Sequence, residues 1–272
     1  MSSSERSDIE AYYAQGDELG RLVAGAIGAL EFERSKEIIL RRLPPAPAVV
    51  ADIGGGPGRY ALWLAELGYE VEHRDLMPLH VEQLLASLDG AGPVRTGIRD
   101  ARDLDLGDAS VDSVLLLGPV YHLKRRADRV LALREAGRVV RPGGPVFVAA
   151  ISRWAPRLDA VLRHRLDLSY PQLVPELFEL ERTGRGKPVL PGGFTAYFHR
   201  PGQLRQEVRA AGLEVADLVS VEGAAFLLGD LADRMADPDG KQVVLEAARA
   251  IERVPELVGL GPHLIATAIR RA

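Results

Sequence analysis

The chain has 272 residues, enough for one large domain with a well-buried core. Hydrophobic residues make up 47% of it, charged residues make up 26%, and the formal net charge is -4, which disfavours a nucleic-acid partner. Cysteine is absent from the sequence, and this excludes disulfides, thiolate metal ligands and a cysteine nucleophile.

The N-terminal region predicts a helical cap. Apolar residues recur at helical spacing between positions 9 and 43, which predicts two helices that end before the prolines at positions 44, 45 and 47. Residues 1–8 are Ser-rich and acidic and lack the apolar stretch of a signal peptide. No apolar run in the sequence is long enough to span a bilayer. We therefore expect a cytoplasmic protein that has no membrane partner.

Short apolar stretches that alternate with amphipathic stretches predict an α/β fold. The predicted strands are 48–53, 69–74, 94–98, 111–117, 146–151, 213–221 and 263–269. The predicted helices that follow the cap are 60–67, 78–88, 127–140, 201–211 and 231–253. This alternation is typical of a doubly wound, mostly parallel sheet, here with seven strands.

The pattern divides the chain into four parts. The predicted cap covers residues 1–43, and a ligand-binding core covers residues 44–152. Residues 153–200 are a mid-chain insertion, rich in glycine and proline near its end, and residues 201–272 complete the core sheet. Long loops with glycine hinges often close over a site, so we expect the insertion to close a substrate pocket.

The most informative segment is the glycine-rich turn after the first predicted strand. It reads Asp52-Ile53-Gly54-Gly55-Gly56-Pro57-Gly58. Closely spaced glycines let a ligand approach the backbone, and the helix that follows directs its amides toward an anionic group. The spacing is Gly54-x-Gly56-x-Gly58, and Arg59 occupies the position that would complete a dinucleotide-type G-x-G-x-x-G.

This turn and its acidic neighbours resemble the class I S-adenosylmethionine-dependent methyltransferases. In that family the first motif is an acidic residue, an apolar residue and G-x-G-x-G. A second strand ends in an acid that binds the ribose hydroxyls, where this chain has Asp75, and a third is followed by an acid near the adenine, where it has Asp100. The resemblance implies a Rossmann-like methyltransferase fold with S-adenosylmethionine as cofactor and S-adenosylhomocysteine as product. The residues that it assigns to the cofactor are Asp52, Gly54, Gly56, Gly58, Asp75, Leu76, Asp100, Ala101, Gly118 and Tyr13.

Three of these assignments have a structural alternative. The alternative for Asp75 is the N-cap of the helix that begins near Pro78, and the alternative for Asp100 is the cap of a turn, with cofactor contact favoured for both. Tyr13 belongs to an aromatic pair near the N-terminus and is assigned as part of a lid over the cofactor, because relatives often fold an N-terminal helix over that site. The alternative for Tyr13 is a buried aromatic residue of a surface helix.

The catalytic candidates are two histidines. His122 follows the fourth predicted strand, at the edge of the sheet where doubly wound folds bind ligands, and His199 follows the insertion. Either is a candidate base, with a helix-capping role as the alternative for His122. Tyr121 and Tyr197 are candidate substrate contacts, with core packing as the alternative, and Arg153 is a candidate partner for an anionic substrate group.

The expected reaction is in-line transfer of a methyl group to an oxygen or nitrogen atom of an unidentified small molecule. Alternatives are a non-catalytic S-adenosylmethionine-binding protein and an NAD-dependent oxidoreductase, the latter disfavoured by Arg59 in the glycine turn. No group of histidines and carboxylates stands out at metal-ligand spacing, so no metal is expected. The N-terminal helices would also support a homodimer.

Overall fold

The structure is a computed structural model that describes residues 25–88, 92–187 and 195–271, together with Tyr13, Gly20 and Leu22. Within these residues one sheet of eight strands has the order β3-β2-β1-β4-β5-β8-β7, and β6 pairs with β5 beside this path. The strands are β1 (Val49–Ile53), β2 (Glu70–Asp75), β3 (Val94–Ile98), β4 (Ser113–Leu116), β5 (Pro145–Ser152), β6 (Phe198–His199), β7 (Leu213–Ser220) and β8 (His263–Arg270).

The sheet confirms the predicted doubly wound, mostly parallel architecture. Strands β1 to β5 are parallel to one another, whereas β8 is antiparallel to both β5 and β7. The seven predicted strands are present, and β6 is an eighth that the sequence did not predict. Phe198 and His199 pair with Ile151 and Ser152 at the carboxyl end of β5, so these two residues, predicted to lie in the insertion, belong to the sheet.

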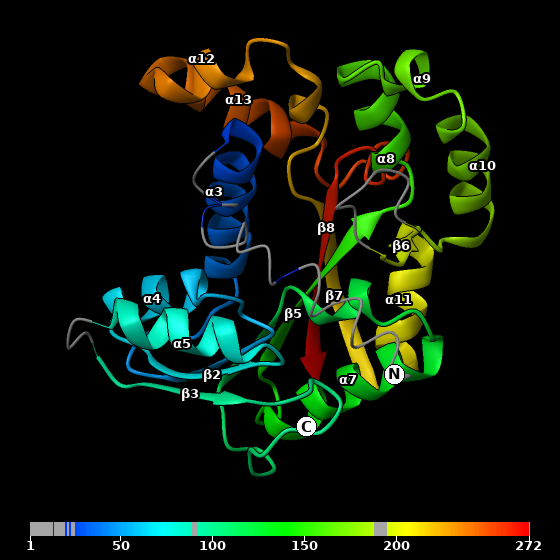
Figure 1. Cartoon of the computed structure of the whole chain (residues 1–272). Helices are drawn as coiled ribbons and strands as arrows, with labels where there is room; N and C mark the ends of the chain where they lie inside the picture. The colour runs from blue at the N-terminus through cyan, green and yellow to red at the C-terminus, as the bar shows by residue number, and fades with distance from the viewer. Residues whose placement is uncertain are drawn as a thin grey trace.

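Helices cover both faces of the sheet (Figure 1). The α-helices are α3 (Ala26–Leu40), α4 (Arg59–Glu66), α5 (Pro78–Ser87), α6 (Pro119–His122), α7 (Arg126–Val139), α8 (Ala155–Arg157), α9 (Leu166–Ser169), α10 (Leu173–Thr183), α11 (Pro201–Ala210), α12 (Leu231–Ala236) and α13 (Pro238–Ile251). The second helix of the predicted cap is α3, whereas most of the first lies outside the described residues. The stretch predicted as one helical region from 231 to 253 divides at Asp237, whose side chain caps α13 by accepting a hydrogen bond from Gly240 N at 2.7 Å.

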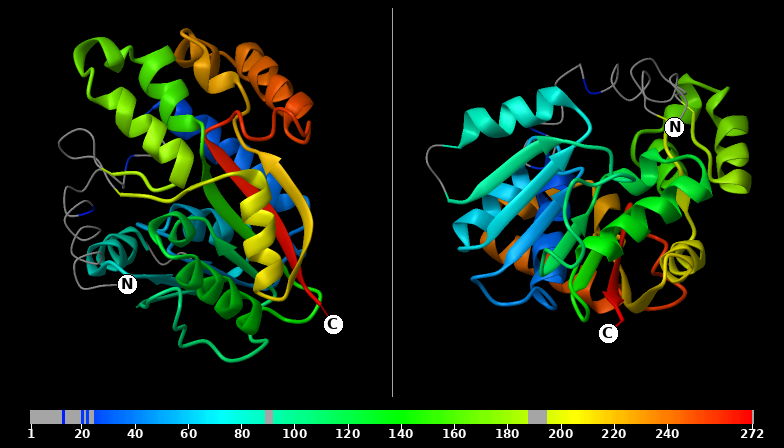
Figure 2. Two further views of the ribbon diagram at one scale, coloured as in Figure 1. Left: turned by 90° about the vertical axis from the view of Figure 1, so that its right-hand side faces the viewer. Right: turned by 90° about the horizontal axis from the view of Figure 1, so that it is seen from below.

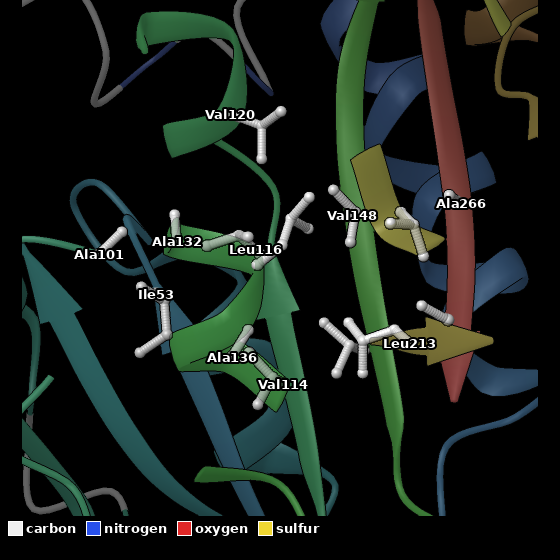
Figure 3. Close-up of a cluster of buried hydrophobic side chains, with 14 of the residues drawn as sticks. Ile53, Ala101, Val114, Leu116, Val120, Ala132, Ala136, Val148, Leu213 and Ala266 are labelled. Atoms are coloured by element: carbon white, nitrogen blue, oxygen red, sulfur yellow. The ribbon is translucent and has the colours of Figure 1, made fainter. Parts of the chain in front are cut away.

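The pleat of the strands sends alternate side chains into two cores. On one face Val114, Leu116 and Val148 pack against α7 and α11, as Figure 3 shows for part of this cluster. On the other face Leu115 and Phe147 pack against side chains of α3, α4 and α5. Because both faces are buried, the central strands are continuously apolar, and this made them recognisable in the sequence.

Contacts made by two arginines attach α3 to the end of the sheet. Arg34 is fully buried and donates from Nε to Val221 O at 3.1 Å and from Nη2 to Glu252 at 2.5 Å. Arg41, two turns further along α3, also bonds Glu252, at 2.8 Å. These contacts fix α3 against the segment that follows β7 and the end of α13.

The segment between β5 and β6 contains the short helices α8 and α9 and the longer α10, which Figure 2 shows grouped together at one side of the molecule. Arg157 joins α8 to α10 through an ion pair with Glu181 at 2.5 Å. Among the described residues, no helix has the length and apolar character needed to cross a membrane.

Candidate active site

The glycine-rich turn joins β1 to α4 at the carboxyl edge of the sheet. Gly54, Gly56 and Gly58 all adopt positive φ angles, which side chains rarely tolerate. A Cβ added to Gly54 would lie 2.4 Å from the Pro119 ring, so glycine is required at this position for the first turn of α6 to pack against the loop. Gly118 makes the reciprocal approach, since its added Cβ would lie 2.9 Å from Gly54 O. The turns after β1 and β4 therefore touch and form one wall of a pocket.

That pocket lies where the sheet order reverses, between β1 and β4, the position at which doubly wound folds bind ligands. Its empty volume is about 1050 Å³, including the part that opens to solvent. The lining residues are Tyr13, Leu22, Asp52, Gly54, Gly55, Gly56, Pro57, Arg59, Tyr60, Asp75, Leu76, Met77, His80, Arg99, Asp100, Ala101, Leu117, Gly118, Pro119, Tyr121, His122 and Leu123. Of the residues that the sequence assigned to the cofactor, all except Gly58 line it.

Asp75 ends β2 and is fixed by several donors. Its Oδ2 accepts a hydrogen bond from Gly56 N at 2.8 Å, and its Oδ1 accepts from Met77 N at 2.8 Å and bonds His80 Nδ1 at 3.0 Å. Burial opposes the charge of Asp75, but the hydrogen bonds from His80, Met77 and Gly56 prevail and lower its pKa. Asp75 is therefore an ionised carboxylate that also joins the glycine turn to the start of α5.

The Asp52 side chain lines the same pocket but lacks the hydrogen-bond donors that surround Asp75. It is 1% exposed, and neither carboxylate oxygen has a hydrogen-bond partner within 3.5 Å among the described residues. Burial, reinforced by the negative charge of Asp75, raises the pKa of Asp52 to about 7. A buried carboxylate without a partner is costly, and a cationic or hydrogen-bond-donating ligand would compensate for it.

Asp100 follows β3 and is already paired. Arg102 donates to its two oxygens from Nε at 2.9 Å and from Nη2 at 2.6 Å, and the Arg102 backbone amide adds a third bond at 2.9 Å. Burial opposes ionisation, but these bonds prevail and lower the pKa of Asp100. Asp100 and the adjacent Ala101 line the pocket as predicted, although Arg102 occupies much of the hydrogen-bonding capacity of the carboxylate.

His122 lies at the other side of the pocket, at the end of α6. Residues 119–122, which lie between a predicted strand and a predicted helix, form one helical turn that begins at Pro119. The Tyr13 hydroxyl lies 2.7 Å from His122 Nε2, and the Tyr121 and His122 ring centroids are 4.7 Å apart. Tyr13 also contacts His80 edge to face at 4.9 Å. One tyrosine from the N-terminal region thus contacts a histidine on each side of the pocket.

Three of the predicted catalytic and substrate-contact residues do not line the pocket. His199 is fully buried, and its Nε2 lies 3.2 Å from Glu207 Oε2. Arg153 is 1% exposed and donates from Nε to Phe198 O at 2.8 Å and from Nη2 to Gln203 at 2.8 Å. The prediction that these side chains meet a substrate is not supported, because both are held by internal partners.

Tyr197, the third of these residues, packs in the same buried cluster. The guanidinium of Arg129 lies 3.6 Å from the centre of the Tyr197 ring and also pairs with Glu207 at 2.6 Å. Arg129 further donates to the carbonyls of Leu123 and Lys124, which directly follow α6, at 2.9 and 3.0 Å. This cluster therefore supports the turn that carries His122 instead of contacting a ligand itself.

Two histidines of β2 and α5 are additional residues of the site. His73 lies beneath the glycine turn, with Nδ1 2.8 Å from Thr96 Oγ1 and Nε2 3.0 Å from Gly56 O. His80 lines the pocket directly. A sequence signal for His80 does exist. His80 lies in the first turn of the helix predicted to begin at residue 78, and that turn directly follows Asp75.

One group of potential metal ligands lies outside the pocket. Glu31, Glu222 and His263 each place a ligand atom within 4.8 Å of the others. Both oxygens of the fully buried Glu222 are engaged by His263, one by Nδ1 at 2.6 Å and one by the backbone N at 3.0 Å. We interpret the group as a contact that joins α3 to the neighbouring ends of β7 and β8.

Comparison with known proteins agrees with this site. Residues 51–148, which contain the glycine turn, Asp75 and α6, match the family model described as a methyltransferase domain. The chain is 28% identical over 188 residues to a ubiquinone biosynthesis O-methyltransferase of Xanthomonas axonopodis, an alignment that covers 67% of this chain and 69% of that protein. It is 34% identical over 122 residues to an uncharacterized methyltransferase of Mycobacterium tuberculosis, covering 44% of this chain and 47% of that protein.

A solved structure shares the fold at greater length. The 1,6-didemethyltoxoflavin-N1-methyltransferase of Burkholderia thailandensis, solved with 1,6-didemethyltoxoflavin and S-adenosylhomocysteine, has a TM-score of 0.56 and 18% identity. The match covers 98% of this chain and 87% of that one. The fold and the pocket thus define a Rossmann-like methyltransferase. Residues 51–148 match a methyltransferase domain, and the fold, the pocket and the relatives support an S-adenosylmethionine-dependent enzyme with S-adenosylmethionine as its cofactor.

The residues present fit this cofactor. The partnerless carboxylate of Asp52 suits the ammonium group of the methionine moiety, and the ionised Asp75 suits a ribose hydroxyl. The glycine turn, with no side chain over its backbone, allows the close approach that the cofactor requires. An NAD-dependent oxidoreductase, the alternative that the glycine turn alone left open, is set aside by the family match.

Proposed function

We propose that this protein methylates an oxygen or nitrogen atom of a small molecule and that His122 accepts the proton of that atom. The hydrogen bond between the Tyr13 hydroxyl and His122 Nε2 carries this assignment, because it holds an imidazole in the pocket beside the glycine turn. S-adenosylmethionine, when bound, supplies an activated methyl group. Proton acceptance by a positioned base is needed when the attacking atom carries a proton.

The identity of the relatives supports a small-molecule acceptor. The Xanthomonas relative is named an O-methyltransferase of ubiquinone biosynthesis, and the Burkholderia structure is named an N1-methyltransferase. In this chain the pocket side chains near His122 include Leu117, Pro119, Tyr121 and Leu123, an apolar surface suited to a ring compound. We propose that Tyr121, whose ring lies beside His122, contacts the acceptor.

The part of the pocket formed by α6 also has to align the acceptor with the methyl group. Most of the acceleration of a methyl transfer comes from holding the acceptor in line and close to the methyl group. α6 can do this because Val120 is buried in the core and the Tyr121 carbonyl accepts a hydrogen bond from Tyr197 N at 2.7 Å. The turn is thus anchored on two sides, and its Tyr121 and His122 side chains line the pocket.

The test is turnover of methyl-labelled S-adenosylmethionine with a panel of phenols, hydroxyquinones and ring N–H compounds. We expect one class to be methylated and His122→Gln to lower kcat for it by about 10²- to 10⁴-fold, the usual contribution of a general base. His164→Gln, at a half-exposed histidine outside the pocket, is the matched control and should leave kcat unchanged. Binding of the cofactor without turnover of any acceptor would instead favour a non-catalytic cofactor-binding protein.

A further inference from the structure

His80 combines deep burial with one ring nitrogen that has no partner. The side chain is 3% exposed and lines the pocket. Its Nδ1 lies 3.0 Å from Asp75 Oδ1, whereas its Nε2 has no hydrogen-bond partner among the described residues. A buried polar atom of this kind costs free energy unless a ligand pairs with it. The location of His80 therefore points to a ligand contact that the family motif does not include.

Asp75 determines which nitrogen of His80 carries the proton. Because its pKa is lowered, Asp75 is ionised near neutral pH and only accepts hydrogen bonds. The bond between the two side chains therefore requires a proton on His80 Nδ1. Nε2 is the ring nitrogen left to pair with a ligand in the pocket wall.

The hydrogen bonds at Asp75 show why a second acceptor is needed. Oδ1 is engaged by Met77 N and His80 Nδ1, and Oδ2 accepts from Gly56 N. A carboxylate offers about four lone-pair sites, so roughly one remains for a ligand. The ribose of S-adenosylmethionine has two neighbouring hydroxyl groups, and each donates one hydrogen bond. Asp75 alone cannot accept from both in this arrangement.

We propose that His80 Nε2 forms a hydrogen bond with one ribose hydroxyl of the cofactor, a group that can donate or accept, while Asp75 accepts from the other. The proposal rests on the proposed function only in requiring that the chain binds S-adenosylmethionine. The contact of the Tyr13 ring with His80, at 4.9 Å, encloses the imidazole on one side and favours a direct bond over solvation by water. His80 is thus a specificity residue for a ribose that carries both hydroxyls.

The experiment pairs a change in the protein with a change in the ligand. Calorimetric titration would measure the Kd of S-adenosylhomocysteine and of its 2′-deoxy and 3′-deoxy ribose analogues for the full chain. His80→Asn keeps an amide donor near the Nδ1 position, where it can still bond Asp75. The same substitution removes the ring nitrogen Nε2. His80→Phe removes both, and His164→Asn, outside the pocket, is the control.

For the wild-type protein and the control, loss of either hydroxyl should weaken binding at least about threefold, with the larger loss for the hydroxyl that pairs with the ionised Asp75. In His80→Asn one of the two analogues should bind within about twofold of the parent compound, because its hydroxyl has already lost its partner. If His80→Phe fails to fold, His80→Asn carries the test. Equal losses for both analogues in His80→Asn and in the wild type would overturn the role of His80.

A spectroscopic measurement gives a second reading that is independent of affinity. In protein labelled with ¹⁵N-histidine, the His80 signals are assigned by their absence in His80→Asn, and Nδ1 should carry the proton shared with Asp75. Addition of S-adenosylhomocysteine should shift the Nε2 signal, and an unchanged Nε2 would contradict the proposal. Absence of any S-adenosylhomocysteine binding by the wild type is a different outcome, which overturns the proposed function and the role of His80 together.

Discussion

Asp52 and Asp75 lie on neighbouring strands and line the same pocket, yet Asp75 accepts hydrogen bonds from Gly56 N and Met77 N, whereas neither Asp52 oxygen has a partner within 3.5 Å among the described residues. The two carboxylates consequently differ in charge near neutral pH. The pKa of Asp75 is lowered by its donors, whereas burial and the charge of Asp75 raise that of Asp52 to about 7. We interpret Asp75 as a preorganised acceptor and Asp52 as a group that the bound cofactor satisfies.

Asp75→Ala should weaken S-adenosylmethionine binding by about 1–3 kcal/mol, because it removes a charged acceptor and frees the glycine turn from β2. Calorimetric titration measures this change directly. Asp108→Ala, an exposed carboxylate far from the pocket lining, serves as the control and should bind like the wild type. An unchanged affinity for Asp75→Ala would show that the carboxylate does not contact the cofactor.

Asp52→Asn should stabilise the cofactor-free protein while weakening cofactor binding. The folded-state pKa of about 7 exceeds the ordinary value of 3.8, so the folded protein binds more protons than the unfolded chain between these values, and stability falls as pH rises through that range. The full difference between these two pKa values corresponds to about 4 kcal/mol of stability at most. Urea unfolding at pH 5 and pH 8 should therefore show that Asp52→Asn raises the free energy of unfolding more at pH 8 than at pH 5. A gain in the free energy of unfolding that does not depend on pH would mean that Asp52 is already ionised in the cofactor-free protein.

Glu207→Ala should lower the free energy of unfolding by about 3–5 kcal/mol, because it leaves the buried guanidinium of Arg129 without its carboxylate. Burial disfavours the charge of Glu207, but bonds from Arg129 and His199 lower its pKa to about 2. The stabilisation it provides should thus be lost as pH falls from 4.5 toward 2. Glu179→Ala, which breaks an exposed ion pair with Arg182, should leave stability unchanged in the same denaturation experiment. Equal stability of the two variants would contradict the role of the buried cluster.

His122→Gln and His199→Gln should behave in opposite ways. Loss of His122 should remove the acid-side limb of the pH dependence of kcat, on which kcat rises as the base loses its proton, with little effect on the unfolding temperature. Loss of His199 should lower the unfolding temperature, because its buried partner Glu207 loses a hydrogen bond, but should leave the shape of the pH profile intact. A changed pH profile for His199→Gln would restore that residue as a catalytic candidate.

Much of the core could be predicted from the sequence because its signals are local. Apolar runs of five to eight residues identify buried parallel strands, and Gly143-Gly144 and Pro44-Pro45 mark the breaks between elements. The β6 strand has only two residues, and α6 has only four, so neither produces a periodic pattern. Both depend on partners distant in sequence: β6 on the end of β5, and α6 on the glycine turn.

The direction of side chains limited the prediction of the site. Arg153 directly follows β5 and His199 is the last residue of β6, but their side chains are held by Gln203 and Glu207 of α11. Residue type and sequence position do not distinguish these cases, because the deciding contacts come from a helix that follows later in the chain. His80 was missed for the complementary reason: its role depends on the hydrogen bonds already made by Asp75.

Calorimetric titration of the full chain with S-adenosylmethionine, S-adenosylhomocysteine and NAD tests the central claim most directly. The account predicts micromolar binding of the first two at one site and no binding of NAD, because the glycine turn, Asp52 and Asp75 together form a pocket for an S-adenosyl compound. Binding of NAD with no response to S-adenosylmethionine or S-adenosylhomocysteine would contradict it.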